Sequence, residues 1–330
     1  DFGGITMNPE EHKMGIKGSS TRQVFFNDCH VPVENMLSDR GNGFKIAVNI
    51  LNIGRIKLSA AAIGGSREVL NLAVNYSNER VQFDRPISKY GAIRFKIAEM
   101  AAKIYAVESA NYRAGQNIDD AYDELVAGGM DEGKAKLKST EQFAVECAIL
   151  KVWGSEVLDY VTDEGVQIYG GMGYSADAPM EAAYRDARIS RIYEGTNEIQ
   201  AIDLLVRKVL ADGGQGLATL LTTLPGTAPS PAASARRHAL VEITQTLAIA
   251  AQSDAELPYW VADDYLRAVA LVLLDWAWCQ IGAASHGERW NAPAQALTQW
   301  VLPEFDMRAA ILRQRIAQSL EIKNKLAASA

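Results

Sequence analysis

The spacing of apolar residues constrains the fold of this chain more than any other feature of its sequence. Apolar residues recur at helical spacing from Gly43 to Tyr76, again from 93 to 107, and again from 143 to 161. The second set alternates intervals of four and three residues, as in a helix that buries one face in a bundle. Its members are Ile93, Ile97, Met100, Ile104 and Val107. We therefore predict a mostly helical fold, organised as an up-down four-helix bundle.

Glycine and proline divide the chain into segments. Residues 1–37 hold turn signals around one or two short strands, and residues 115–133 read as a polar connector with a glycine-rich tip. Residues 211–233 combine Gly, Pro, Ser and Thr, which is typical of a linker. Helical patterns rich in alanine and tryptophan return at 234–330. We predict that the bundle occupies residues 38–210 and that a helical C-terminal extension follows the linker.

Composition narrows the class of protein. The 330 residues are 48% hydrophobic and 22% charged, which is typical of a globular chain. The formal net charge of −7 argues against nucleic acid as a partner, because binding to phosphates depends on releasing counterions to a basic surface. The longest apolar run is interrupted by Asp275 and Gln280, so we predict no transmembrane segment.

Three cysteines at wide spacing argue against a disulfide framework and fit a reducing compartment. The four histidines are scattered, and no pattern of ligands predicts a metal site. The sequence opens at Asp1 without a signal peptide, in what reads as the middle of a domain. We expect a fragment or a processed product.

Glu194 is the candidate for chemistry that the residue pattern itself suggests. An apolar stripe that includes Ile192 and Tyr193 is broken by Gly195 and resumes at Ile199. Glu194 then lies at a helix break, where freed backbone amides can donate to a ligand oxygen. A glutamate before a glycine is more often a solvated helix end, so spacing alone leaves both interpretations open.

Two linked motifs favour the functional interpretation of Glu194, because they resemble a known family. Residues 185–200 read RDARISRIYEGTNEIQ, and residues 163–180 read DEGVQIYGGMGYSADAPM. Both resemble the active-site region of the acyl-CoA dehydrogenases, in the order and at the separation found in that family. These flavoproteins introduce a double bond between Cα and Cβ of an acyl thioester. In many branches the glutamate of Y-E-G-T is the catalytic base, and the resemblance implies that role for Glu194.

The resemblance also implies a substrate site. It places Arg55, Tyr193 and Gly195 beside the acyl-CoA, with the arginine near the catalytic carboxylate. Some branches carry their catalytic glutamate at the position of Gly54. Because that position is a glycine here, Glu194 is the expected base.

The implied cofactor is FAD, shared between two subunits. The loop at 78–95 is expected to reach the flavin of the neighbouring chain, where a guanidinium suits a pyrophosphate. This sequence departs from the family pattern at Asp84, where glycine is common, and at Gly91, where some branches have glutamine. The implied cofactor-binding residues are Arg80, Gln82, Phe83, Gln167, Gly170 and Gly171 toward the partner's cofactor, and Thr196 and Glu198 toward the chain's own.

For the whole protein, the resemblance makes residues 1–37 the end of a central β-domain whose remainder, with an N-terminal helical domain, is absent from this chain. The extension at 234–330 favours the very-long-chain and related long-chain branches, and we expect acyl chains of medium to long length. An electron-transferring flavoprotein is the expected acceptor, in a homodimer or homotetramer. A bacterial protein of this kind is expected in the cytoplasm, and a eukaryotic one in the mitochondrial matrix.

Two other functions are compatible with the sequence. The first is a relative on the same fold, such as an acyl-CoA oxidase or a DNA-associated flavoprotein, although the net charge argues against DNA. The second is a cofactor-free interaction or assembly module, which the expected absence of most of the β-domain would allow.

Overall fold

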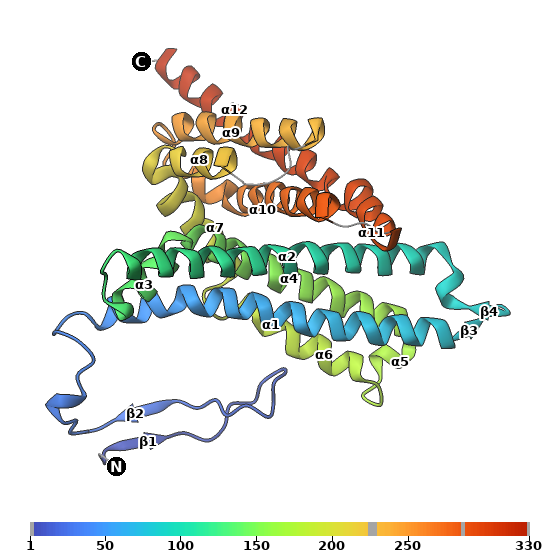
Figure 1. Cartoon of the computed structure of the whole chain (residues 1–330), viewed down its shortest axis with the longest axis horizontal. Helices are drawn as coiled ribbons and strands as arrows, with labels where there is room; N and C mark the ends of the chain where they lie inside the picture. Colours follow the sequence, from blue (N-terminus) through green and yellow to red (C-terminus); the bar gives the residue numbers. More distant parts are fainter. Residues whose placement is uncertain (1–2, 224–229, 285–287, 329–330) are drawn as a thin grey trace.

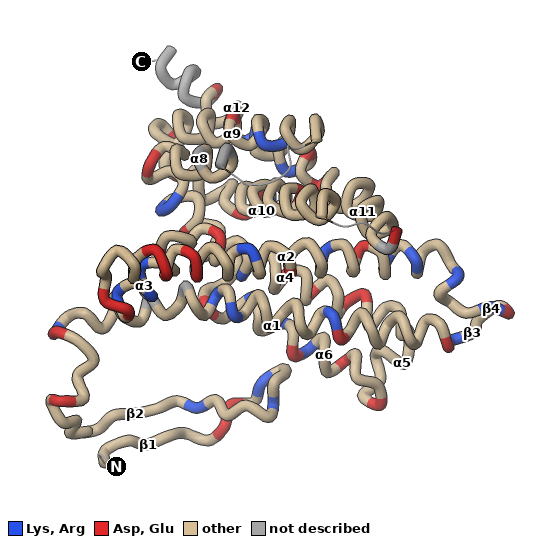
Figure 2. The backbone as a smooth tube through the Cα atoms, in the orientation of Figure 1, with Lys and Arg blue, Asp and Glu red and all other residues tan. Residues whose placement is uncertain are grey.

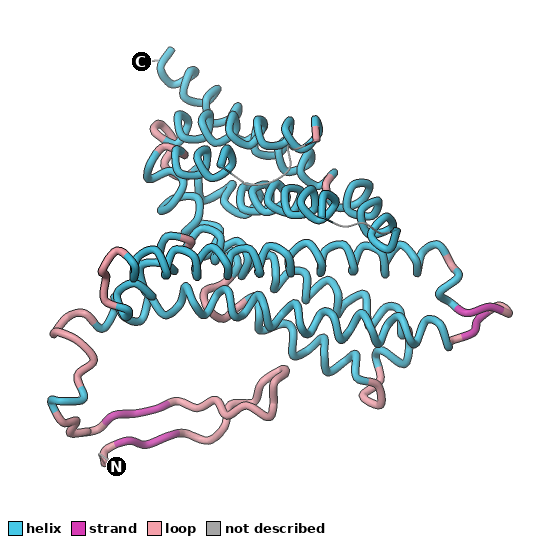
Figure 3. The backbone as a smooth tube through the Cα atoms, viewed as in Figure 1, coloured by secondary structure: helices cyan, strands magenta, loops and turns pink. Residues whose placement is uncertain are grey.

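The computed structural model describes residues 3–223, 230–284 and 288–328. Helices dominate it, and strands occur in the described chain only as two short antiparallel pairs (Figure 1, Figure 3). Ile5 pairs with Phe26 in the first, and Val81 with Pro86 in the second. The strands are β1 (Ile5–Met7), β2 (Val24–Phe26), β3 (Val81–Gln82) and β4 (Arg85–Pro86). The predicted mostly helical fold class is confirmed.

Three long helices form the frame of the bundle: α1 (Gly43–Glu79), α2 (Gly91–Ala127) and α4 (Ala144–Tyr169). They lie side by side along the length of the molecule (Figure 1), and α1 packs most extensively against α4. Gly154 makes this packing close, since a Cβ added there would lie 2.9 Å from the Cα of Ser59. The close approach holds α1 and α4 in a fixed register, and the candidate site lies where they face each other.

Short elements complete the bundle and connect its long helices. A hairpin of β3 and β4 joins α1 to α2, and α3 (Glu132–Gln142) leads into α4. The segment after α4 folds back along it. Its elements are α5 (Gly171–Tyr174), α6 (Pro179–Ala187), the 3-10 helix η3 (Arg188–Arg191), α7 (Asn197–Ile202), the π-helix η4 (Asp203–Val209) and the 3-10 helix η5 (Leu210–Asp212). Two further 3-10 turns are η1 (Val33–Asn35) and η2 (Ile87–Lys89).

The C-terminal extension packs against the α2 and α7 side of the bundle through its central helix α10 (Leu257–Ala284). Long stretches of α10 carry no charge (Figure 2), and α9 (Pro231–Ala251) and α12 (Pro303–Ala328) cover it. By length and composition α10 could cross a membrane, but 61% of its most apolar window is buried within the protein, as in a core helix. The other elements are α8 (Gln215–Thr223), the 3-10 helix η6 (Glu288–Trp290), α11 (Asn291–Ala296) and the π-helix η7 (Leu297–Val301).

The N-terminal segment lies away from the long helices (Figure 1). Its apolar residues are exposed on both strands, with Phe26 at 69%. It contacts α6 through two hydrogen bonds, from Arg185 Nη1 to Met14 O at 2.7 Å and from Ile16 N to Asp186 Oδ1 at 2.5 Å. Its assignment to the end of a central β-domain stays a prediction.

Two predicted segments differ from the structure. The connector predicted at 115–133 is wrong for most of its length, because α2 continues to Ala127 and only the turn at 128–131 separates it from α3. The predicted linker at 211–233 contains α8 and the start of α9, and its residues 224–229 lie outside the described chain. The bundle and extension boundaries therefore stay a prediction.

Candidate active site

Glu194 lies in a strained turn between η3 and α7. Thr196 caps α7, and its hydroxyl accepts a hydrogen bond from Ile199 N at 3.3 Å. The φ angles of Glu194 and Gly195 are +59° and +81°. The left-handed conformation costs a residue other than glycine about 1–2 kcal/mol. Neighbouring contacts therefore have to hold Glu194 in place.

The carboxylate of Glu194 packs against α1 where that helix has a glycine. A Cβ added at Gly54 would lie 3.0 Å from Glu194 Oε2 and 3.1 Å from its Cδ. Even a methyl group at this position would crowd the carboxylate, and a longer side chain would have to displace it. The predicted relationship between Gly54 and Glu194 thus has a geometric basis: the two positions compete for the same space.

The turn leaves several polar groups without partners. Glu194 Oε2 is buried and has no hydrogen-bond partner among the described residues. The backbone amides of Glu194, Gly195 and Thr196 also lack an acceptor within the described chain. An unpartnered buried acceptor costs about 1–3 kcal/mol. A carboxylate beside three free amides is an arrangement that can accept a proton and bind a ligand oxygen in one place.

Three buried side chains support the turn from α4 and α7. Lys151 Nζ donates to Gly195 O at 2.8 Å and to Asn197 Oδ1 at 2.7 Å. Gln200 Nε2 donates to Glu194 O at 2.7 Å. The motif comparison did not identify Lys151, Asn197 or Gln200. A signal was present for the lysine, which is the only charged residue in the apolar run 147–153.

Burial sets the electrostatics of this support. Lys151 is completely buried, and the loss of hydration lowers its pKa from 10.5 to about 8. Glu198 and Glu194 oppose this shift, while Arg55 reinforces it. The pKa of Glu198 is lowered by a hydrogen bond from its own backbone amide, with a smaller contribution from the Thr196 hydroxyl. The neighbourhood of Glu194 therefore contains both carboxylates and cations, and their effects on the pKa of Lys151 oppose each other.

A second group of predicted residues gathers at the other end of α1. Arg80, Gln82 and Phe83 belong to the hairpin that follows this helix, and Phe83 is 88% exposed. Phe83 adopts a φ of +50° and Asp84 a φ of +64°, so the hairpin turn itself is strained. Both angles lie in the region that favours glycine, which is the residue expected at position 84.

The end of α4 meets this hairpin end. The rings of Tyr76 and Tyr169 stack with centroids 4.0 Å apart, and the Tyr76 hydroxyl donates to Tyr169 O at 3.3 Å. This contact brings Gln167, Gly170 and Gly171 to the same end as Arg80. Gly170 has a φ of +60°, and added Cβ atoms at both glycines would meet open space.

The predicted site residues thus form two groups on one chain. Arg55, Tyr193, Gly195, Thr196 and Glu198 surround or adjoin Glu194, and the remaining six lie at the hairpin end. Along α1, Gly54 and Arg80 are separated by about 39 Å at a rise of about 1.5 Å per residue. A small ligand bound at Glu194 cannot contact the hairpin of the same chain.

The apolar side chains around Glu194 lie at the surface of the described chain. Ile192 and Tyr193 are each 46% exposed, and Ile199 is 56% exposed. These members of the predicted stripe therefore lie outside the core, whereas Leu205, which continues the stripe on η4, is completely buried. The substrate contact predicted for Tyr193 stays a prediction.

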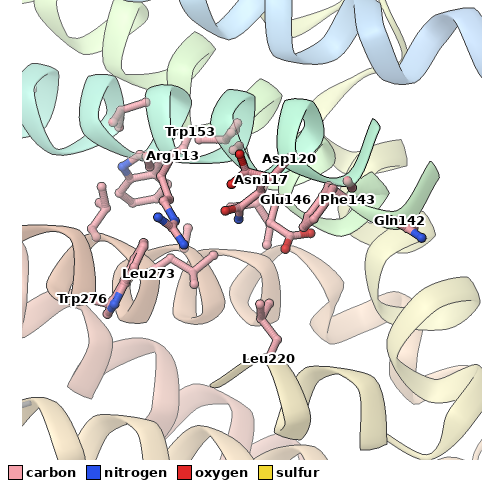
Figure 4. A pocket seen from close by; sticks show the side chains of 18 of the residues that line it. Arg113, Asn117, Asp120, Gln142, Phe143, Glu146, Trp153, Leu220, Leu273 and Trp276 are labelled. Carbon is pink, nitrogen blue, oxygen red and sulfur yellow. The ribbon is translucent and has the colours of Figure 1, made fainter. Parts of the chain in front are cut away.

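A separate cavity of about 530 Å³ lies between the bundle and the extension and does not include Glu194. Figure 4 shows Arg113 and Asp120 of α2, Glu146 of α4, and Leu273 and Trp276 of α10 around it. Burial raises the pKa of Glu146. The cavity marks the contact between the two helical units and is distinct from the candidate active site.

Comparison with known proteins identifies the chain. The family model described as acyl-CoA dehydrogenase, C-terminal domain, matches residues 41–209. The chain belongs to the acyl-CoA dehydrogenase family. The matched region contains both groups of predicted site residues. The predicted family is confirmed, and the named members of this family are dehydrogenases, a class of oxidoreductases.

Two curated members of this family show how much of their length the chain matches. A probable acyl-CoA dehydrogenase of Bacillus subtilis (strain 168) is 47% identical over 202 residues, which are 61% of this chain and 34% of that protein. The very long-chain specific acyl-CoA dehydrogenase of Homo sapiens, a mitochondrial protein, is 40% identical over 223 residues, which are 68% of this chain and 31% of that protein. The chain spans about a third of the length of these curated relatives.

A solved acyl-CoA dehydrogenase from Bacillus anthracis, complexed with FAD, matches with a TM-score of 0.80 and 32% identity. The match covers 97% of this chain and 60% of that one. It therefore includes the C-terminal extension, which lies beyond the family model. The extension is a feature that this chain shares with a solved member of its family.

Proposed function

We propose that this chain carries the proton-abstracting part of an FAD-dependent acyl-CoA dehydrogenase, with Glu194 as the base. The observation that carries the proposal is the Glu194 carboxylate, held on a strained turn with its buried Oε2 unpartnered. A carboxylate kept free of hydrogen bonds and ion pairs is available to accept a proton from a bound substrate.

The neighbouring backbone suits the same reaction. The α-hydrogen of an acyl thioester is weakly acidic, and its removal places negative charge on the carbonyl oxygen. The unpartnered amides of Glu194, Gly195 and Thr196 offer donors to that oxygen, as in an oxyanion hole. Glu194 takes the α-proton, and the turn stabilises the charge that remains.

The chemistry of the donor groups fits FAD. Arg80 provides an exposed guanidinium for a pyrophosphate, and the open space at Gly170 and Gly171 lets a ligand approach the backbone closely. Gln82, Phe83 and Gln167 would complete this contact, and Thr196 and Glu198 would touch the cofactor at the other group. When bound, FAD would accept the hydride that leaves Cβ.

The separation of the two groups supports an assembly of at least two chains. Because the groups lie about 39 Å apart along α1, one chain would supply the Glu194 group and its neighbour the Arg80 group. We infer a homodimer or homotetramer, with an electron-transferring flavoprotein as acceptor.

The C-terminal extension supports acyl chains of medium to long length. Bacterial and mitochondrial relatives support a cytoplasmic or a mitochondrial matrix location, respectively.

The experiment that tests this proposal is an absorption spectrum before and after anaerobic addition of a long-chain acyl-CoA. We expect the purified chain to show flavin absorbance that the substrate bleaches. Glu194→Gln should retain the flavin, and the rate at which the substrate bleaches it should fall by a factor on the order of 10²–10⁴. Glu68→Gln, which changes an exposed carboxylate of α1, is the matched control and should bleach normally.

Normal bleaching by Glu194→Gln would exclude Glu194 as the base. Absence of flavin after supplementation with FAD would contradict cofactor binding by this chain. Rapid oxygen consumption with acyl-CoA would favour an oxidase over a dehydrogenase.

A further inference from the structure

Lys151 is a buried cation beneath the turn that carries Glu194. Its side chain is completely buried on α4, where an ammonium ion loses its hydration. Both hydrogen bonds that the structure gives its Nζ go to the turn and the start of α7, at Gly195 O and Asn197 Oδ1. Ser155 donates to the same Asn197 oxygen at 3.3 Å. The fold thus retains a group that is costly to bury and directs it at residues 195–197.

Two donors hold two consecutive carbonyl groups of the turn. Gln200 Nε2 bonds Glu194 O at 2.7 Å, and Lys151 Nζ bonds Gly195 O at 2.8 Å. Because each peptide unit is planar and trans, a fixed carbonyl also fixes the direction of the N–H that follows it. The two donors therefore orient the amides of Gly195 and Thr196 and hold the positive φ of Gly195, which lies between the two fixed peptide units.

Lys151 does not hydrogen-bond the Glu194 carboxylate. Within the described chain, Glu194 Oε2 has no partner, and the lysine bonds only backbone and amide oxygens. The ammonium ion therefore fixes the backbone of the base without blocking its carboxylate. A lysine paired directly with the carboxylate would instead occupy the atom that has to receive the proton.

We propose that Lys151 is a positioning residue that holds the Glu194 turn in its reactive conformation by bonding Gly195 O and Asn197 Oδ1 together. The proposal rests on the proposed role of Glu194 for its effect on turnover, but its effect on the turn can be measured separately.

Charges from four sides act on this lysine. Glu198 lies on α7, Arg55 on α1, Glu194 on the turn, and Glu156 on α4 itself. The three carboxylates favour the charged ammonium, and the arginine disfavours it. The ammonium form makes the stronger, charge-assisted hydrogen bonds to the turn.

Hydrogen–deuterium exchange tests the conformational part on the chain as it exists. Lys151→Met keeps the length of the side chain and removes the donor, so the amides of 193–200 should exchange at least about tenfold faster, with α10 unchanged. Lys208→Met is the matched control, since Lys208 is a half-buried lysine of the same bundle that bonds Ala144 O and Asp203 instead of the turn. It should leave 193–200 unchanged.

Unchanged exchange of 193–200 in folded Lys151→Met protein would overturn the proposal. Should that variant fail to fold, Lys151→Leu, which also removes the donor, carries the same test. Lys151→Arg keeps the charge and should restore part of the protection. Loss of protection in the Met variant that arginine does not restore at all would also overturn it, because it would indicate a packing defect.

Turnover of the FAD-loaded enzyme tests the consequence. Lys151→Met should lower kcat by a factor on the order of 10², as expected for a misplaced catalytic group, with KM changed less than about threefold. The rise of the rate with pH that a general base produces should remain at the lower rate, and its loss would overturn the proposal by making Lys151 the proton acceptor.

The two proposals can fail separately. If Glu194→Gln abolishes turnover and Lys151→Met leaves kcat unchanged, the positioning role is wrong and the base stands. If Lys151→Met loosens 193–200 and Glu194→Gln turns over normally, the lysine holds the turn as proposed and the identity of the base is wrong.

Discussion

The bundle and the C-terminal extension are both helical, but they bury different kinds of side chain. Around the Glu194 turn, the bundle buries Lys151, Asn197 and Gln200. The core of the extension is apolar over most of α10, where Leu266 and Leu271 are completely buried, and the buried Asp275 of this helix is paired with Arg236. All the described residues other than glycine that have a positive φ lie before residue 195.

This difference separates stability from reactivity. A buried apolar side chain contributes roughly 1.5–3 kcal/mol and has no directional requirement. A buried lysine or an unpartnered carboxylate costs free energy, and the fold tolerates it where chemistry requires it. The extension therefore has the composition of a stabilising element. The turn at Glu194 has the composition of a functional site, which the rest of the bundle supports.

The largest expected effect on stability comes from the extension. Leu271→Ala should lower the free energy of unfolding by about 2–5 kcal/mol, because a completely buried leucine leaves a cavity. Turnover of the folded protein should be unchanged. Chemical denaturation measures the first and a steady-state assay the second. Leu273→Ala, at a half-buried position beside the existing cavity, is the control and should cost less.

The second prediction concerns how the free energy of unfolding depends on pH through the buried Lys151. Its folded pKa of about 8 lies below the ordinary 10.5, so between these values the unfolded chain holds a proton that the folded chain has lost. Raising the pH therefore disfavours unfolding. At about 1.36 kcal/mol per pH unit, wild type should gain about 3 kcal/mol relative to Lys151→Met across this window. Denaturation at pH 8 and pH 10.5 measures it, and an equal stability difference at both values would contradict the buried charge.

The third prediction concerns two glycines of α1. Gly54→Ala places a methyl group 3.0 Å from Glu194 Oε2 and should lower kcat/KM by about tenfold, equivalent to 1.36 kcal/mol. Gly64→Ala is the matched control, because an added Cβ there meets open space. It should leave kcat/KM unchanged and stabilise the helix by about 0.5–1 kcal/mol. Full activity of Gly54→Ala would show that the carboxylate does not depend on its packing against α1.

The smallest effect is expected at a buried hydroxyl pair in the extension. The Thr244 and Tyr265 hydroxyl oxygens lie 2.6 Å apart. Tyr265→Phe should lower the free energy of unfolding by about 1 kcal/mol, since Thr244 keeps its hydrogen bond to Leu240 O. Tyr259→Phe, at an exposed position, should change it by less than about 0.5 kcal/mol. A loss of turnover in Tyr265→Phe would contradict the view that the extension affects stability and the bundle affects reactivity.

Apolar periodicity was sufficient to predict the long helices. The interval pattern from Ile93 to Val107 identified α2 correctly, but Gly115 and the polar residues after it suggested a premature end. Apolar residues at 114, 118, 121 and 125 keep the helical spacing, and the polar side chains between them occupy the other faces of α2. The helix ends where Gly128 and Gly129 occur together, with Gly129 at a φ of +87°.

The candidate site could be predicted only in part, for a physical reason. Glu194 and Gly195 belong to a short contiguous motif, so the helix break is visible in the sequence. Lys151 is separated from Gly195 by 44 positions, and only the packing of α4 brings them together. Contacts of this kind depend on helix register, which close approaches such as Gly154 against Ser59 determine.

The length of α1 has a genetic consequence. If each site takes Glu194 from one chain and Arg80 from its neighbour, a mixed dimer of Glu194→Gln and Arg80→Ala chains contains one doubly defective site and one intact site. Two alleles that are inactive alone would then complement each other when expressed together. Alleles that affect the same end of α1 would not.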